Sequence, residues 1–129
     1  MKKAQRAFTL IEIMIVVCII ALLAGIAIPN LLRAKVTSNQ SSAQATLKAI
    51  STALESYSIT NGVYPTAVTS LTGAAPPYLN KDYFSSTVNG YNFTPSFTDY
   101  AYTVTAVPAS SNQGTQSYTI STGGILTTN

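Results

Sequence analysis

The chain has 129 residues, of which 47% are hydrophobic and only 9% are charged, so beyond an apolar anchor it can build one small domain. It lacks histidine and has one cysteine, Cys18, which excludes the usual zinc sites, cysteine nucleophiles with a histidine base and Ser-His-Asp triads. The net charge of +3 comes from Lys2, Lys3 and Arg6, since the remaining four cations and four anions balance. We therefore expect neither an enzyme nor a metal, cofactor or nucleic-acid site.

The segment from residue 8 to residue 32 is almost wholly apolar and exceeds the roughly 20 residues that a membrane helix needs. Because three cations precede it, the positive-inside rule places the N-terminus in the cytoplasm and the later residues outside. A cleaved secretory signal, cut near the small residues Gly25 to Ala27, is the rival interpretation. It is disfavoured because the acidic residue Glu12 would serve no purpose in a discarded segment.

The helical pattern continues past the apolar segment to Asn61, where Gly62 can supply a left-handed helix cap. Apolar residues recur three, four or seven positions apart, which predicts one amphipathic face, with Ser51 and Glu55 off that face. The face comprises Leu32, Val36, Ala43, Leu47, Ile50, Leu54 and Tyr57. Within the apolar part, Pro29 removes a backbone donor and Gly25 loosens the same region, so we expect a kink there.

After Tyr64 and Pro65 the pattern becomes that of a small sheet. We expect a helical turn over residues 66–71, a loop over residues 74–82, and three or four short antiparallel strands. The strands are predicted at residues 91–94, 100–107 and 117–122, with the Ser- and Thr-rich residues 94–98 and 109–117 as exposed loops. The outer half of the long helix would cover the sheet, which gives an α+β fold.

Glu12 is the residue that most needs an explanation. A carboxylate inside a membrane helix costs roughly 2.5–3.5 kcal/mol, so its presence indicates a function and a partner. Lys3 and Arg6 lie outside the three- and four-residue spacings that meet on a helix. A cut between Ala7 and Phe8 would create an α-amino group on Phe8, which could pair with Glu12 in the same subunit or in a staggered neighbour.

The run Phe8-Thr9-Leu10-Ile11-Glu12, after a basic leader and before a long apolar helix with Pro29, resembles type IV pilins and the pseudopilins of type II secretion. The resemblance implies that a prepilin peptidase removes the leader and that Phe8 is N-methylated. It also implies that Glu12 neutralises a neighbour's N-terminus and that the helix between Gly25 and Pro29 partly unwinds in a filament. The chain departs from the family at Ala7, where glycine is usual.

These inferences divide the chain into a leader at 1–7, a transmembrane or filament-core helix at 8–32, its amphipathic continuation at 33–62 and a small domain at 63–129. The leading hypothesis is a subunit of a type IV pilus-like homo-oligomeric filament. An assembly platform and ATPase would extrude it from the bacterial inner membrane to a periplasmic or extracellular position.

Two alternatives remain open at this stage. One is the major pseudopilin of type II secretion, which usually has an acidic calcium-binding loop. Only Asp82 and Asp99 follow the helix here, which is few for a cation that needs six to eight oxygen ligands. The other is a single-pass membrane protein whose outer sheet binds a ligand without polymerising, and this alternative leaves Glu12 unexplained.

Overall fold

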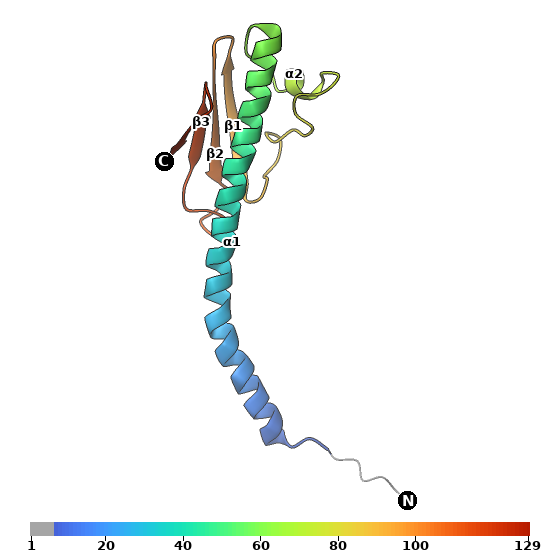
Figure 1. Ribbon diagram of the computed structural model, residues 1–129. Coiled ribbons are helices and arrows are strands. Elements are labelled where there is room, and N and C mark those ends of the chain that lie inside the picture. The colour runs from blue at the N-terminus through green and yellow to red at the C-terminus, as the bar shows by residue number, and fades with distance from the viewer. Residues whose placement is uncertain (1–6) are drawn as a thin grey trace, which may run out of the picture. The chain divides into compact units, whose positions relative to one another are not determined.

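The computed structural model describes residues 7–129 (Figure 1). The chain forms two compact units, one ending at Ala34 and the other comprising Lys35–Asn129. Its helices are α1, Leu10–Asn61, and α2, Thr69–Thr72. Its strands are β1, Tyr91–Thr98; β2, Ala101–Pro108; β3, Tyr118–Ser121; and β4, Ile125–Thr128. One long helix with a small sheet confirms the predicted α+β fold class.

The four strands form one sheet in the order β1-β2-β3-β4, with every neighbouring pair antiparallel. Inward and outward side chains alternate along β2, as the period of a strand requires. Tyr102, Val104 and Ala106 are buried, whereas Thr103 is exposed. Asp99 and Tyr100 form the tight turn between β1 and β2, so these two strands pair along their full length.

The core of the second unit lies between the sheet and the part of α1 that follows Lys35. The predicted helix face is confirmed at Leu47, Ile50 and Leu54, which are fully buried. Figure 1 shows the sheet on one side of this part of α1 and α2 on the other. Tyr57 of α1 contacts Tyr78 edge to face, with ring centroids 5.3 Å apart, and so anchors the loop after α2. The sheet contributes the buried residues Tyr91, Phe93, Tyr102, Val104, Ala106, Tyr118 and Ile120.

The expected loop over residues 94–98 is wrong, because β1 continues through these residues to Thr98. Each of them pairs with a residue of β2, including Pro95 opposite Val104. Proline lacks a backbone N–H and is tolerated in a sheet on an edge strand. β1 is such an edge, so Pro95 does not interrupt the ladder.

Ser51 and Glu55 were expected off the buried face of the helix, which is wrong for Ser51, since it is buried, while Glu55 is half-buried and bonded to the rest of the unit. The Ser51 hydroxyl lies 2.7 Å from the Tyr102 hydroxyl. The Glu55 carboxylate accepts hydrogen bonds from the Tyr64 hydroxyl at 3.0 Å, the Tyr102 hydroxyl at 3.1 Å and the Gly123 N–H at 2.9 Å. These five residues, the Glu55 cluster, fasten α1 to the following loop, to β2 and to the turn before β4.

The two tyrosines of the Glu55 cluster hold their protons more tightly than free tyrosine. Burial raises the pKa of Tyr102, and its bond to Glu55 raises it further, whereas the bond to Ser51 acts in the opposite direction. Burial and the nearby Glu55 carboxylate likewise raise the pKa of Tyr64. Both effects follow from the cost of placing a second negative charge in a partly desolvated site.

We expect this arrangement to make the domain sensitive to alkali. A pKa raised in the folded state gives stability that is complete below the unfolded value, about 10, and is lost as the pH rises through the folded value. Thermal unfolding of the full chain in detergent, followed by near-ultraviolet circular dichroism, should show this loss. Tyr102→Phe should flatten the pH dependence, whereas Tyr100→Phe, outside the cluster, should leave it. If Tyr102→Phe lost stability with rising pH as steeply as the unmodified chain, the assignment of this pH dependence to Tyr102 would be contradicted.

Candidate functional site

The candidate site lies at the start of α1, where Thr9 and Glu12 bind each other. The Thr9 N–H and the Thr9 hydroxyl both donate to Glu12 Oε2 at 2.7 Å. The Glu12 N–H donates in return to Thr9 Oγ1, with the two atoms 3.4 Å apart. Because α1 begins at Leu10, Thr9 is its N-cap and Glu12 is its third residue, and this exchange of bonds is a capping box.

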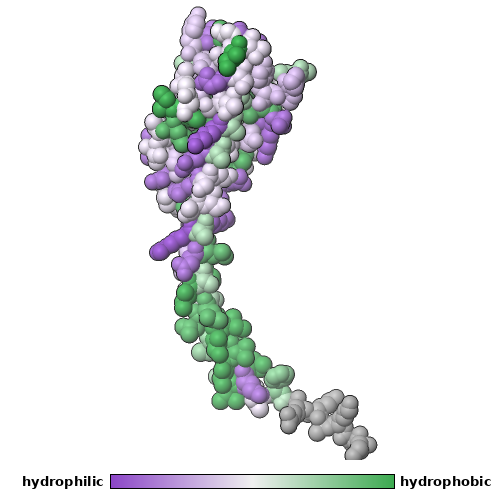
Figure 2. Space-filling model, viewed as in Figure 1, coloured by the Kyte–Doolittle hydropathy of each residue, from purple (hydrophilic) through white to green (hydrophobic). Residues whose placement is uncertain are grey.

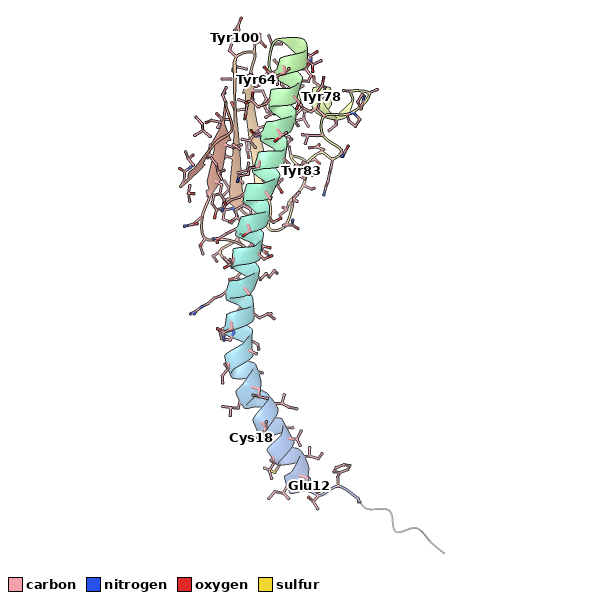
Figure 3. The ribbon with its side chains drawn as sticks, in the orientation of Figure 1. Glu12, Cys18, Tyr64, Tyr78, Tyr83 and Tyr100 are labelled. Atoms are coloured by element: carbon pink, nitrogen blue, oxygen red, sulfur yellow. The ribbon has the colours of Figure 1, made fainter. Side chains whose placement is uncertain are left out.

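Thr9 is a partner of Glu12 that sequence reasoning missed, because only cations and the Phe8 amine were considered as its partners. The sequence carried the signal, because Thr or Ser followed three residues later by Glu, just before an apolar run, is the pattern of a capping box. The threonine engages only one carboxylate oxygen. Within residues 7–129 no hydrogen bond reaches Glu12 Oε1. Figure 3 shows Glu12 at the first turn of the helix. Oε1 therefore keeps the capacity to accept a further hydrogen bond.

The first unit presents a helix whose apolar side chains are uncovered. Its N-terminal part is long and apolar enough to cross a membrane. Figure 2 shows this part of α1 as an almost continuous hydrophobic surface. Apolar surface on this scale marks a membrane or protein contact. The exposed large side chains include Phe8, Leu10, Ile11, Ile13, Met14, Val17, Ile20, Leu23, Ile28 and Leu32.

The residues of the predicted kink lie inside α1. The helix runs through Gly25 and Pro29, and the Asn30 side-chain amide donates to the Ile26 carbonyl at 3.1 Å. A Cβ added at Gly25 would meet nothing within 4 Å, so no packing contact requires glycine there. Pro29 cannot donate the backbone bond that an ordinary residue would give to the carbonyl of Gly25. The kink itself stays a prediction.

Ala7 and Phe8, on either side of the predicted cut, precede the helix and are both exposed. Lys2, Lys3 and Arg6 lie outside the described residues, so the orientation that they predict remains a prediction. Cys18 is exposed on α1 and forms no disulfide. Among residues 7–129 no three His, Cys, Asp or Glu side chains lie close enough together to hold a metal ion.

Comparison with known proteins places this geometry in a family. The family model of the prokaryotic N-terminal methylation motif matches residues 2–28, which include Ala7, Phe8, Thr9 and Glu12. The model of type II secretion system protein G matches residues 30–119, more than half of the chain. The chain belongs to the type II secretion system protein G family. The resemblance to pilins and pseudopilins that the sequence suggested is therefore confirmed.

Relatives of this protein G family member include a type IV major pilin and core proteins of type II secretion systems. The chain is 38% identical over 103 residues to the type IV major pilin protein PilA of Myxococcus xanthus, covering 79% of this chain and 38% of the relative. It is 42% identical over 64 residues to the type II secretion system core protein G of Vibrio cholerae, covering 50% of this chain and 44% of the relative. The chain thus spans less than half the length of each of these relatives.

We expect Thr9→Val to loosen the first turn of α1 without changing side-chain shape. Loss of an N-cap hydroxyl costs about 1 kcal/mol, which should speed amide hydrogen exchange at residues 12–16 about fivefold, since the amides before them have no acceptor within the helix. Exchange measured by mass spectrometry on the full chain in detergent would test this. Thr9→Ser keeps the hydroxyl and should behave as the unmodified chain does. Unchanged exchange in Thr9→Val would show that the capping box does not hold this turn.

Proposed function

We propose that this chain is a structural subunit of a type IV pilus-like filament, assembled by packing of its N-terminal helices and by pairing of Glu12 with the amine of Phe8. The observation that carries the proposal is the exposed apolar part of α1, which begins with Glu12, a carboxylate of which residues 7–129 engage only one oxygen. Membership of the protein G family and the match to the methylation motif support it. The role is structural, since Asp82 and Asp99 are exposed and far apart in the sequence, and Glu55 is engaged by its cluster.

The proposed processing and assembly of the subunit begin in the membrane. Before assembly it spans the bacterial inner membrane once, with its N-terminus in the cytoplasm. A prepilin peptidase then cuts between Ala7 and Phe8, and Phe8 is methylated. Support comes from the exposure of both residues ahead of the helix, because a peptidase needs an extended and accessible segment. The inner-membrane assembly platform and its ATPase would move the subunit into a periplasmic or extracellular filament.

Charge pairing gives the filament its specificity. Among residues 7–129 nothing donates to Glu12 Oε1, and an uncompensated carboxylate within an apolar helix bundle costs energy. The amine that the cut creates on Phe8 is the complementary charge. When the amine of one subunit binds the carboxylate of a staggered neighbour, both charges are neutralised and the apolar surfaces of the two helices meet.

The pseudopilus of type II secretion is the second candidate, and a specific observation favours it. The protein G model matches most of the region after the membrane segment, including β1 and β2. The similarity to PilA, in turn, extends over more of this chain than the similarity to the core protein G of Vibrio cholerae. Deletion in the native host separates the candidates, because loss of surface filaments indicates a pilus and retention of exported enzymes in the periplasm indicates a pseudopilus.

We expect Glu12→Val to yield a protein that inserts into the membrane and fails to enter filaments. Valine removes the carboxylate while preserving the apolar character of the helix. Membrane fractionation and electron microscopy of sheared filaments would measure the two steps separately. Asp82→Asn, a matched change at an exposed position outside the helix, should assemble normally. Normal filaments from Glu12→Val would overturn the charge-pairing account.

We expect the mature protein to begin at methylated Phe8. Mass spectrometry of the N-terminal peptide from purified filaments would show this start and the added methyl group. Ala7→Gly restores the residue that is usual in the family, so it should give the same start with at least equal processing. An intact Met1, or a start at Ile28 from signal peptidase cleavage, would defeat the proposed processing.

A further inference from the structure

The exposed apolar side chains of the second unit are unevenly distributed. Residues 35–129 expose five large apolar side chains, and four of them lie on segments toward the end where α1 terminates. The strand register places the fourth of these, Ile125, in line with Thr103 near the start of β2. Figure 3 shows Tyr100 at this end, at the turn between β1 and β2. We call this end, with Asp99, the tip surface. Its apolar members are Ile59, Val63, Tyr100 and Ile125, with exposed fractions of 85%, 39%, 85% and 61%.

The tip surface is held in a fixed arrangement by hydrogen bonds beneath it. The Tyr64 N–H donates to the Asp99 carbonyl at 3.0 Å, which ties the residues after α1 to the β1–β2 turn. Glu55 accepts the Gly123 N–H at 2.9 Å, which ties α1 to the turn that precedes Ile125. Three separate segments are therefore joined through their backbones, which lowers the entropic cost of ordering them on binding.

The electrostatics of the tip surface favour a cation. Its exposed charged residue is Asp99. The C-terminal end of α1 lies at the same end of the unit and carries no basic residue in its last turn. The end of a helix carries a partial negative charge that Lys or Arg normally offsets. Since the last turn of α1 holds no such residue, a cation from a binding partner would be stabilised there.

The opposite end of the same unit has the complementary charge. Lys35 is exposed there, and residues 35–54 contain no acidic residue. Hydrogen bonds between uncharged groups fasten the loops at this end to α1. The Asn39 side-chain amide donates to the Gln113 carbonyl at 2.9 Å, and the Gln40 side-chain amide donates to the Thr115 hydroxyl at 2.9 Å. The fifth exposed apolar side chain, Val107, also lies at this end of β2. We call Lys35, Val107 and these loops the base surface.

We propose that the tip surface of one copy binds the base surface of a second copy, with Lys35 of the second copy facing Asp99 and the end of α1. Tyr100 and its apolar neighbours would cover Val107. Two different surfaces meet in such a contact, so each copy keeps one free surface and the assembly can continue. The inference rests on the proposed filament, and it adds a contact outside the membrane helix to the helix packing.

Cysteine cross-linking of intact filaments tests this contact directly. The full chain would carry Cys18→Ser together with Lys35→Cys and Asp99→Cys, and a short bifunctional thiol reagent would be applied. A head-to-tail contact should give a ladder of multimers that requires both cysteines, whereas either single variant should give none. Filaments without a ladder would overturn the proposal, and a product limited to dimers would do the same, because only a self-complementary contact stops there.

Charge reversal provides a second test that is independent of cross-linking geometry. Asp99→Lys should reduce filament yield, and adding Lys35→Asp should restore it, whereas Asp82→Lys should have little effect. All three positions are exposed, so the fold should persist, and circular dichroism would check this. Full filament yield from Asp99→Lys would defeat the contact alone. A failure of the unmodified, processed chain to form filaments would defeat the filament itself and the contact with it.

Discussion

The arrangement of this chain depends on one constraint, the cost of leaving the Glu12 carboxylate unsatisfied within an apolar helix. The capping box with Thr9 meets half of that requirement by engaging Oε2. Within residues 7–129 no donor reaches the remaining oxygen and nothing covers the apolar helix face, and we propose that a neighbouring copy supplies both contacts. Lipid can cover the apolar side chains but offers no strong donor to a carboxylate in its interior. Neighbouring helices with a free amine at the same depth can do both.

A second carboxylate, Glu55, shows how the same problem is solved when the chain folds around the charge. Tyr64, Tyr102 and Gly123 all donate to it, so no outside donor is required. The contrast identifies Glu12 as the unusual acid of the pair. Glu55 fastens the parts of the second unit together, whereas the second oxygen of Glu12, which no group of residues 7–129 engages, is the one that we propose binds another copy. Glu55, whose carboxylate accepts three hydrogen bonds, has a structural role. Glu12, of which residues 7–129 engage one carboxylate oxygen, has the proposed role in assembly.

Much of the fold follows from patterns that the sequence displays openly. The length of the apolar segment and the spacing of Leu47, Ile50 and Leu54 predict α1 and its buried face, and alternation around Val104 predicts β2. The errors arise where polar residues are used for tertiary reasons. Ser and Thr beside Pro95 have the composition of a loop, and only pairing with β2 makes them a strand. The hydrogen bonds of Glu55 include one from Tyr102, which is distant in the sequence. The capping box was missed for a different reason, because the spacing of Thr9 and Glu12 is the sequence pattern of such a box and was not used.

The two proposed contacts between copies have the same directional character. The amine of Phe8 binds the carboxylate of a neighbour, and the tip surface binds the base surface, so each contact joins two unlike groups. Repetition of unlike contacts gives an open helical assembly when the rotation does not close into a ring. Two directional contacts, one in the helical core and one outside it, also constrain the stagger between subunits more tightly than apolar helix packing can, because burial of apolar area alone is non-directional.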